Sequence, residues 1–202
     1  MKTLFIIGGM GAGKSTVARC FVDAGIPTLD LDTVGHVALE KAEVKAALVG
    51  AFGDGILDGA GEVDRKALAA CAFASPEKTA ALVEATNPAI CDGLAEWLAG
   101  RAAEGCGLVA VEVSAFDGAQ GSYAGMYDCL VAVCAPAEAR LSRAVAKGFP
   151  QEDVRRRLAV QPTDTQWRAW ADYVIDNDGD SDHLLAQAEA VLRSIQEREA
   201  DA

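Results

Sequence analysis

A glycine-rich segment near the start of the chain carries the most specific chemistry in the sequence. Gly8, Gly13, Lys14 and Ser15 satisfy the pattern G-x-x-x-x-G-K-[ST], with an apolar run before it and an amphipathic helical pattern after it. Glycines let backbone N–H groups wrap a phosphate without Cβ clashes, and the following helix points its positive end at the anion. The segment is therefore predicted to hold the triphosphate of a nucleotide.

Each side chain of this loop has an expected role. Lys14 should reach the β- and γ-phosphates, and the Ser15 hydroxyl should ligate Mg²⁺, with Asp30 or Glu112 reaching the metal through water. The chain has no N-K-x-D guanine motif, which argues against a GTPase and favours ATP as the nucleotide. The predicted nucleotide ligands in the loop are Gly9, Gly11, Ala12, Gly13, Lys14, Ser15 and Thr16.

Two carboxylates follow the second apolar run, in the segment Asp30-Leu31-Asp32. Carboxylates at the C-terminal edge of a parallel strand point into the ligand crevice, and these two lie on the same side if the strand continues through them. One of them could then accept the proton of an attacking hydroxyl or hold a metal-bound water. The alternative is that Asp32 or Thr33 caps a helix that begins there.

A group of basic residues around 140–160 is the expected source of charge neutralisation. Phosphoryl transfer depends on positioning and electrostatics, so Arg140, Arg143, Lys147 and Arg157 are candidates to neutralise charge on the transferring group. The alternative is a solvated helix face. Arg155, Arg156 and Arg157 cannot all face one site, because neighbours on a helix point about 100° apart.

Short apolar runs separated by helical patterns must position these residues. The runs are 3–7, 27–30, 108–113, 129–134 and 173–176. The helical patterns are 14–24, 33–49, 65–72, 77–100, 136–146, 152–160 and 182–198. Strand alternating with helix indicates an α/β fold with a five-stranded parallel sheet flanked by helices. Trp167 and Trp170 are expected to pack beside the last strand rather than stack on a base.

The interval from 32 to 108 contains no strand pattern, which indicates an inserted helical lobe. We therefore expect a single domain over 1–202, with its core at 1–32 and 108–202 and an inserted helical lobe at 33–107. The tail after about Gln196 is charged and is expected to fray.

The composition of the chain argues against several classes of function. The net charge of −12 argues against nucleic acid as a main partner. Six cysteines without a C-x-x-C pair, together with only two histidines, argue against a zinc site and favour buried thiols in a reducing cytoplasm. No window approaches about 18 uninterrupted apolar residues, so no membrane span is expected. We expect a monomer or a weak homo-oligomer.

Several of these segments together resemble the dephospho-coenzyme A kinases. Residues 8–18, G-G-M-G-A-G-K-S-T-V-A, resemble the family's G-G-I-G-S-G-K-S-T-V-A, and 25–32, G-I-P-T-L-D-L-D, are similar to its G-x-x-x-I-D-A-D. Residues 171–179, A-D-Y-V-I-D-N-D-G, resemble its A-D-x-V-I-x-N-x-G, which lies near the adenine of ATP. The ordered set is far more specific than the phosphate loop alone.

The resemblance implies a P-loop NTPase fold and transfer of the ATP γ-phosphate to the ribose 3′-hydroxyl of dephospho-CoA, the last step of coenzyme A biosynthesis. It implies that Asp32 is the catalytic base, acting with Lys14 and Arg143. It places His36, Arg65 and Asp117 against the acceptor. It also implies that 33–107 is a substrate-binding lobe and that about 140–160, with Arg143, Arg140, Lys147 and Arg157, is a lid that closes over the transferring group. It places Asn177 and Gly179 near the adenine.

Three departures from the family pattern keep alternatives open. Asn87-Pro88 stands where the family has His-Pro, and Lys147-Gly148 stands where it has an arginine followed by an acidic or amide residue. In 113–117 the sequence V-S-A-F-D replaces P-L-L-[hydrophobic]-E, with Asp117 in the place of the glutamate. The alternatives are another P-loop small-metabolite kinase and a catalytically weak nucleotide-binding regulatory protein.

Overall fold

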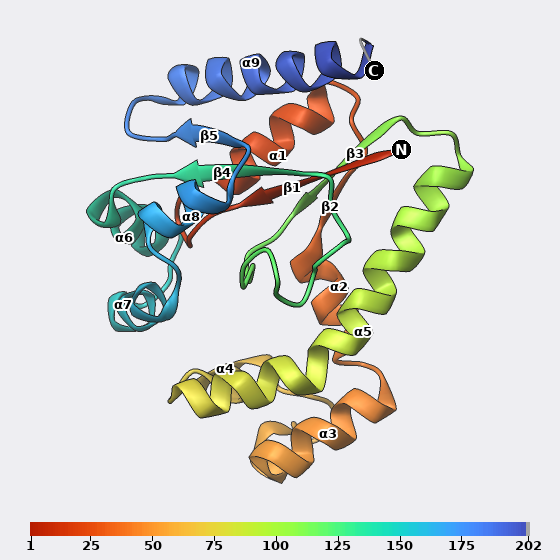
Figure 1. Cartoon of the computed structure of the whole chain (residues 1–202). Helices are drawn as coiled ribbons and strands as arrows, with labels where there is room; N and C mark the ends of the chain where they lie inside the picture. Colours follow the sequence, from red (N-terminus) through yellow and green to blue (C-terminus); the bar gives the residue numbers. More distant parts are fainter. Residues whose placement is uncertain (201–202) are drawn as a thin grey trace. The chain divides into compact units, whose positions relative to one another are not determined.

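A five-stranded parallel sheet in the order β2-β3-β1-β4-β5 lies at the centre of the fold (Figure 1). In this computed structural model, which describes residues 1–200, every neighbouring pair of strands runs parallel. All five predicted strands are confirmed to within about a residue at each end. They are β1 (Lys2–Ile7), β2 (Thr28–Asp30), β3 (Leu108–Glu112), β4 (Cys129–Cys134) and β5 (Tyr173–Asp176).

The helices divide the chain into two compact units. The helical unit, Leu31–Ala99, contains α2 (Leu31–Ala38), α3 (Ala42–Phe52), the short 3-10 helix η1 (Asp54–Ile56), α4 (Arg65–Ala72) and most of α5 (Pro76–Ala103). The P-loop unit, Met1–Asp30 with Gly100–Ala202, contains the sheet and the remaining helices. These are α1 (Lys14–Asp23), α6 (Ala137–Ala146), α7 (Gln151–Val160), α8 (Asp164–Trp170) and α9 (Ser181–Ala200).

The core of the P-loop unit forms where α1 and α9 lie side by side on one face of the sheet (Figure 1). Val17 and Phe21 of α1 are fully buried there. Along α9 the buried residues Leu184, Ala188, Leu192 and Ile195 recur every three or four positions, so one stripe of the helix faces the sheet. The helix continues to Ala200, and residues 201 and 202 lie outside the described part of the chain.

A row of aromatic rings also stabilises the P-loop unit. Trp167 and Trp170 of α8 meet edge to face at 5.4 Å, and Trp170 meets Phe116 at 5.7 Å. Phe116 meets Tyr127 at 5.7 Å, and Tyr127 meets Phe5 of β1 at 5.0 Å. Trp167 is only 1% exposed. The packing role expected for the two tryptophans is thus confirmed, with each edge contact adding roughly 0.5–1.5 kcal/mol beyond burial.

The helical unit has its own core, which explains a wrong helix prediction. The sequence predicts one helix over 33–49, whereas α2 begins at Leu31 and α3 begins at Ala42 after an extended Lys41 (φ −69°, ψ 133°). The turn between them lets Ala38, Val44 and Leu48 enter the same buried cluster.

Helix α5 bends within the helical unit, where its colour passes from yellow to green in Figure 1. Pro88 lies inside this helix and supplies no backbone N–H, which accounts for the bend. Within residues 1–200, no helix is both long and apolar enough to cross a membrane.

Candidate active site

The loop between β1 and α1 has the geometry of a phosphate cradle. Gly13, the N-cap of α1, has φ 107°, and Gly11 has φ 76°, both in the left-handed region that favours glycine. A Cβ on Gly13 would also collide with the side-chain amide of Asn177, and one on Gly11 would collide with the backbone of Arg140. The loop can therefore approach its neighbours closely only because these positions lack side chains.

Lys14 and Ser15 begin α1 directly after this loop. Lys14 is 7% exposed, and its Nζ donates to the carbonyl oxygens of Gly8 at 3.0 Å and Gly9 at 3.5 Å. The ammonium group thus lies against the loop that it is predicted to serve. Ser15 is exposed in the first turn of α1, where its hydroxyl is accessible to a metal ion.

Asn177 ties the end of β5 to the phosphate loop. It is 6% exposed, and its Nδ2 donates to the carbonyl oxygen of Ala12 at 2.7 Å. Arg143 of α6 donates from Nη2 to both the backbone oxygen and Oδ1 of Asn177, each at 3.1 Å. Gly179 follows in the turn before α9, next to the His183 side chain. The fold therefore brings a predicted nucleotide residue and a predicted lid residue together beside the loop.

Arg140, one turn earlier on α6, packs directly on the phosphate loop at Gly9. It is 7% exposed, and within residues 1–200 neither its Nε nor its Nη1 has a hydrogen-bond partner. An unpartnered buried guanidinium is costly unless an anion is present. The alternative of a solvated helix face is therefore wrong for Arg140.

Gln161 is a contact of the loop that was not singled out from the sequence as a site residue. Its Oε1 accepts a hydrogen bond from the Met10 backbone N–H at 2.9 Å. Gln161 follows α7 directly, so it connects that helix to the loop. The signal available in the sequence was its place in the family-like R-[hydrophobic]-x-x-Q pattern, which carries no geometry by itself.

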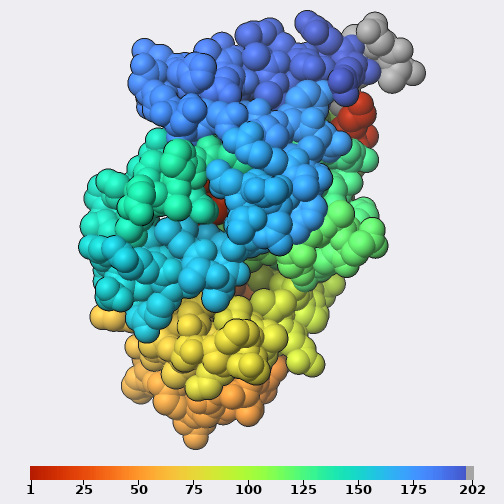
Figure 2. Space-filling model, turned by 60° about the vertical axis from the view of Figure 1, so that its left-hand side comes forward, coloured from red at the N-terminus to blue at the C-terminus, as the bar shows by residue number. Residues whose placement is uncertain are grey.

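The other basic residues of 140–160 lie in different surroundings. Lys147 is exposed at the C-cap of α6, and Arg157 is half-buried in α7. Arg155 and Arg156 are exposed, and Arg156 pairs with Asp153, so the solvated-face alternative fits these two. Figure 2 shows the teal surface of α6 and α7, with a small area of the red N-terminal chain visible between it and the blue surface of α8.

Carboxylates lie at the edge of the sheet where its strands end. Asp30 of β2 is aligned with Glu112 of β3, which is in turn aligned with Ile6 of β1. The strand ends at Asp30, so the condition that placed Asp30 and Asp32 on one side of a continuous strand is not met. Asp32 instead lies in the first turn of α2.

The edge of the sheet where the strands end offers few protein ligands for a metal ion. Within residues 1–200, no group of three or more His, Cys, Asp or Glu residues could hold an ion by itself. Exposed Ser15 and the carboxylates Asp30 and Glu112 fit Mg²⁺, which usually takes one or two protein ligands together with substrate phosphates and water.

The helical unit contains a cavity of about 580 Å³. Its walls are formed by His36, Leu39, Glu40, Glu62, Val63 and Arg65. Two predicted acceptor residues, His36 and Arg65, thus line one pocket. Arg65 is the first residue of α4, and the N-cap carboxylate of Asp64 fixes this helix start by accepting from the backbone N–H groups of Lys66 and Ala67.

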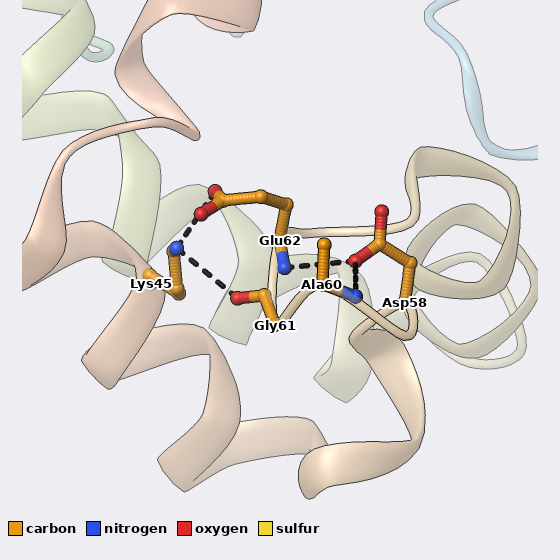
Figure 3. A network of polar contacts seen from close by, with 5 residues as sticks. All are labelled: Lys45, Asp58, Ala60, Gly61 and Glu62. Carbon is orange, nitrogen blue, oxygen red and sulfur yellow. Dashed lines mark hydrogen bonds and ion pairs between the residues drawn. The ribbon is translucent and has the colours of Figure 1, made fainter.

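A tight turn, residues 58–62, supports one wall of this pocket (Figure 3). Asp58 Oδ1 accepts from the backbone N–H groups of Ala60 at 2.8 Å and Glu62 at 3.0 Å, and these bonds lower the pKa of Asp58. Lys45 of α3 donates from Nζ to the Gly61 carbonyl oxygen at 3.1 Å and to Glu62 Oε2 at 2.7 Å. Glu62 therefore lines the pocket with its carboxylate paired to Lys45.

Asp117 belongs to the P-loop unit and has partners of its own. Its two carboxylate oxygens accept from the Ser122 backbone N–H at 3.0 Å, and Oδ2 also accepts from the Ser122 hydroxyl at 2.7 Å. In this structure Asp117 closes the 117–122 loop, and its side chain is exposed.

Comparison with known proteins covers nearly the whole chain. The profile of the family described as dephospho-CoA kinase matches residues 3–183. A dephospho-CoA kinase from Corynebacterium diphtheriae is 37% identical over 186 residues, covering 91% of this chain and 92% of that protein. A dephospho-CoA kinase from Aquifex aeolicus is 36% identical over 196 residues, covering 96% of this chain and 98% of that protein.

Solved structures agree with the sequence relatives. The structure of TT1252 from Thermus thermophilus has a TM-score of 0.78 at 32% identity, covering 96% of this chain and 97% of that one. A shikimate kinase from Acinetobacter baumannii has a TM-score of 0.54 at 19% identity, covering 98% of this chain and 94% of that one, and so shares the fold alone. The chain belongs to the dephospho-CoA kinase family.

Proposed function

We propose that this chain transfers the γ-phosphate of ATP to the ribose 3′-hydroxyl of dephospho-CoA, the final step of coenzyme A biosynthesis, in the cytoplasm. The observation that carries the proposal is the family match over residues 3–183, which includes both the phosphate loop and the acceptor pocket. Family membership implies ATP as the donor. The residue roles below are proposals supported by the contacts already described.

The donor site is built on the phosphate loop. Backbone N–H groups of residues 9–16 hold the phosphates, and Lys14 exchanges its contacts to the Gly8 and Gly9 carbonyls for β- and γ-phosphate oxygens. Asn177 and Gly179 border the adenine. Mg²⁺, held by Ser15 with Asp30 or Glu112 through water, would offset charge on the phosphate oxygens.

The lid arginines supply the remaining positive charge. Arg143 would exchange its two contacts to Asn177 for phosphate oxygens, and Arg140 would gain an acceptor for its unpartnered nitrogens. Lys147 and Arg157 complete the proposed lid. A guanidinium can bind two oxygens of one phosphate at once, whereas Lys147 acts as a point charge.

The acceptor is proposed to bind the helical unit. Asp32 orients the 3′-hydroxyl and accepts its proton as the oxygen attacks phosphorus. His36 and Arg65 contact the acceptor from their shared pocket. We also propose Asp117 as an acceptor contact. In that role its carboxylate would exchange its hydrogen bonds from Ser122 for bonds from the acceptor.

Replacing Asp32, the proposed general base, tests the proposal most directly. Asp32→Asn should lower kcat for dephospho-CoA roughly 10²- to 10⁴-fold while leaving the Kd for ATP within about twofold, because a general base acts in the chemical step. Asp54→Asn, an exposed acidic position in the same helical unit, is the matched control and should retain its turnover.

Three outcomes would contradict the assignment. Full turnover by Asp32→Asn would remove Asp32 from the chemical step. Much faster transfer to shikimate or gluconate than to dephospho-CoA would identify another metabolite kinase. ATP binding by the wild-type protein with no transfer to any acceptor would favour a regulatory protein.

A further inference from the structure

The acceptor pocket of the helical unit has an unusual charge pattern for a site that must take a polyanion. Two basic side chains, His36 and Arg65, share its walls with two carboxylates, Glu40 and Glu62. An anion placed there would gain from the basic pair and be repelled by the carboxylates. Neutralising one of those carboxylates would favour a phosphate group in the pocket.

Lys45 provides that neutralisation. Its Nζ lies 2.7 Å from Glu62 Oε2, and it also donates to the Gly61 carbonyl oxygen (Figure 3). The Lys45 side chain is 24% exposed and does not line the pocket itself. Lys45 therefore acts on the pocket through Glu62 and through the 58–62 turn.

The spacing along α2 indicates which part of the acceptor reaches this pocket. Asp32 and His36 are four residues apart on one helix, so they lie on the same face about 6 Å apart along its axis. In a nucleotide the 5′-oxygen lies a few ångströms from the 3′-hydroxyl. An acceptor whose 3′-hydroxyl contacts Asp32 therefore has its 5′-diphosphate within reach of His36.

We propose that this pocket binds the diphosphate of the acceptor, with His36 and Arg65 as ligands and Lys45 as a positioning residue that holds Glu62 away from the anion. The inference rests on the proposed function, because dephospho-CoA is the acceptor that carries this diphosphate. It assigns the pocket to one chemical group, and it gives the Lys45–Glu62 pair a role in acceptor affinity.

The test measures kcat and KM for dephospho-CoA and for ATP in four variants. Arg65→Met should lower kcat/KM for dephospho-CoA roughly 10- to 100-fold, as expected for a lost charge-assisted hydrogen bond, with KM for ATP unchanged. Lys66→Met, the exposed neighbour on α4, is the control and should behave as wild type. Circular dichroism and the thermal midpoint establish that each variant folds.

Variants of the Lys45–Glu62 pair distinguish an electrostatic role of Lys45 from a structural one. Lys45→Met should raise KM for dephospho-CoA roughly 2- to 5-fold, in the range of a partly exposed ion pair. The double variant Lys45→Met/Glu62→Gln should return KM toward the wild-type value, because it removes the carboxylate that Lys45 neutralises. Equal defects in the single and double variants would overturn the proposed role of Lys45.

Failure of this inference differs from failure of the proposed function. Wild-type turnover of dephospho-CoA, with Arg65→Met and Lys66→Met equally active, would overturn the diphosphate assignment alone. No turnover of dephospho-CoA by the wild-type protein would overturn both.

Discussion

Replacing Arg140 by methionine is expected to stabilise the nucleotide-free protein and weaken its binding of ATP. The side chain is 7% exposed on the phosphate loop, with Nε and Nη1 both lacking partners. Each unsatisfied buried donor costs roughly 1–3 kcal/mol, and methionine keeps much of the apolar stem. After allowance for lost packing we expect a net gain of about 1–3 kcal/mol, or about 2–10 °C in Tm for a chain of this size.

The same substitution should reduce the stabilisation that ATP confers. Loss of one charge-assisted contact to phosphate would weaken affinity roughly tenfold, about 1.4 kcal/mol, so the Tm increase at saturating ATP should shrink by about 3–6 °C. Differential scanning fluorimetry with and without ATP measures both effects on the same samples.

Arg143→Met is the matched comparison, because Arg143 lies one turn along the same helix and its Nη2 has two hydrogen bonds, although within residues 1–200 its buried Nη1 also lacks a partner. It should lower the Tm of the nucleotide-free protein, since two hydrogen bonds to Asn177 at 3.1 Å are lost. If Arg140→Met lowers that Tm as much as Arg143→Met does, the unpartnered guanidinium is not a source of instability and the reasoning is refuted.

Two further predictions concern the phosphate loop and the thiols of half-buried Cys129 and buried Cys134. Gly13→Ala should abolish ATP binding and cost roughly 1–3 kcal/mol of stability, because φ is 107° and a Cβ meets the Asn177 amide; Gly105→Ala, with φ 78° and open space, should retain binding. Burial raises the pKa of Cys129 to about 12 and that of Cys134 to about 11, so iodoacetamide at pH 8 should spare both until the protein unfolds. Rapid labelling of either thiol in the native protein, detected by mass spectrometry, would contradict this protection. The contribution of the two neutral thiols to the free energy of unfolding is present below pH 9.0 and is lost as the pH rises toward the pKa values of the folded protein.

The central strands β1, β3 and β4 were predictable because each is a short, almost fully buried apolar run, and the partly buried outer strands β2 and β5 still interrupt the helical patterns on either side of them. Helix α8 was not predicted, although the signal is present. Thr163 caps this helix and Gln166 reaches back to the Thr163 backbone, which is a capping box that can be recognised in sequence. The break between α2 and α3 left no comparable signal, because burial in a shared core decides it.

The phosphate loop was predictable for the same local reason, and its surroundings were not. Sequence spacing does not show that Arg143 contacts Asn177, or that Arg140 lies buried on the loop. Those contacts depend on where α6 packs, which is a property of the folded chain. The start of α2 at Leu31 likewise depends on where β2 stops pairing with β3, and this moved Asp32 from a strand to a helix.

The edge-to-face tryptophans of α8 give the protein a built-in optical signal. Two indoles 5.4 Å apart at 86° couple their strong far-ultraviolet transitions, so the circular dichroism spectrum should carry an exciton couplet that depends on this packing. The third tryptophan of the chain, Trp97, lies in the helical unit. In a Trp97→Phe background the indole signals would therefore arise from the P-loop unit alone, and nucleotide-induced changes in that unit could be followed without an attached dye.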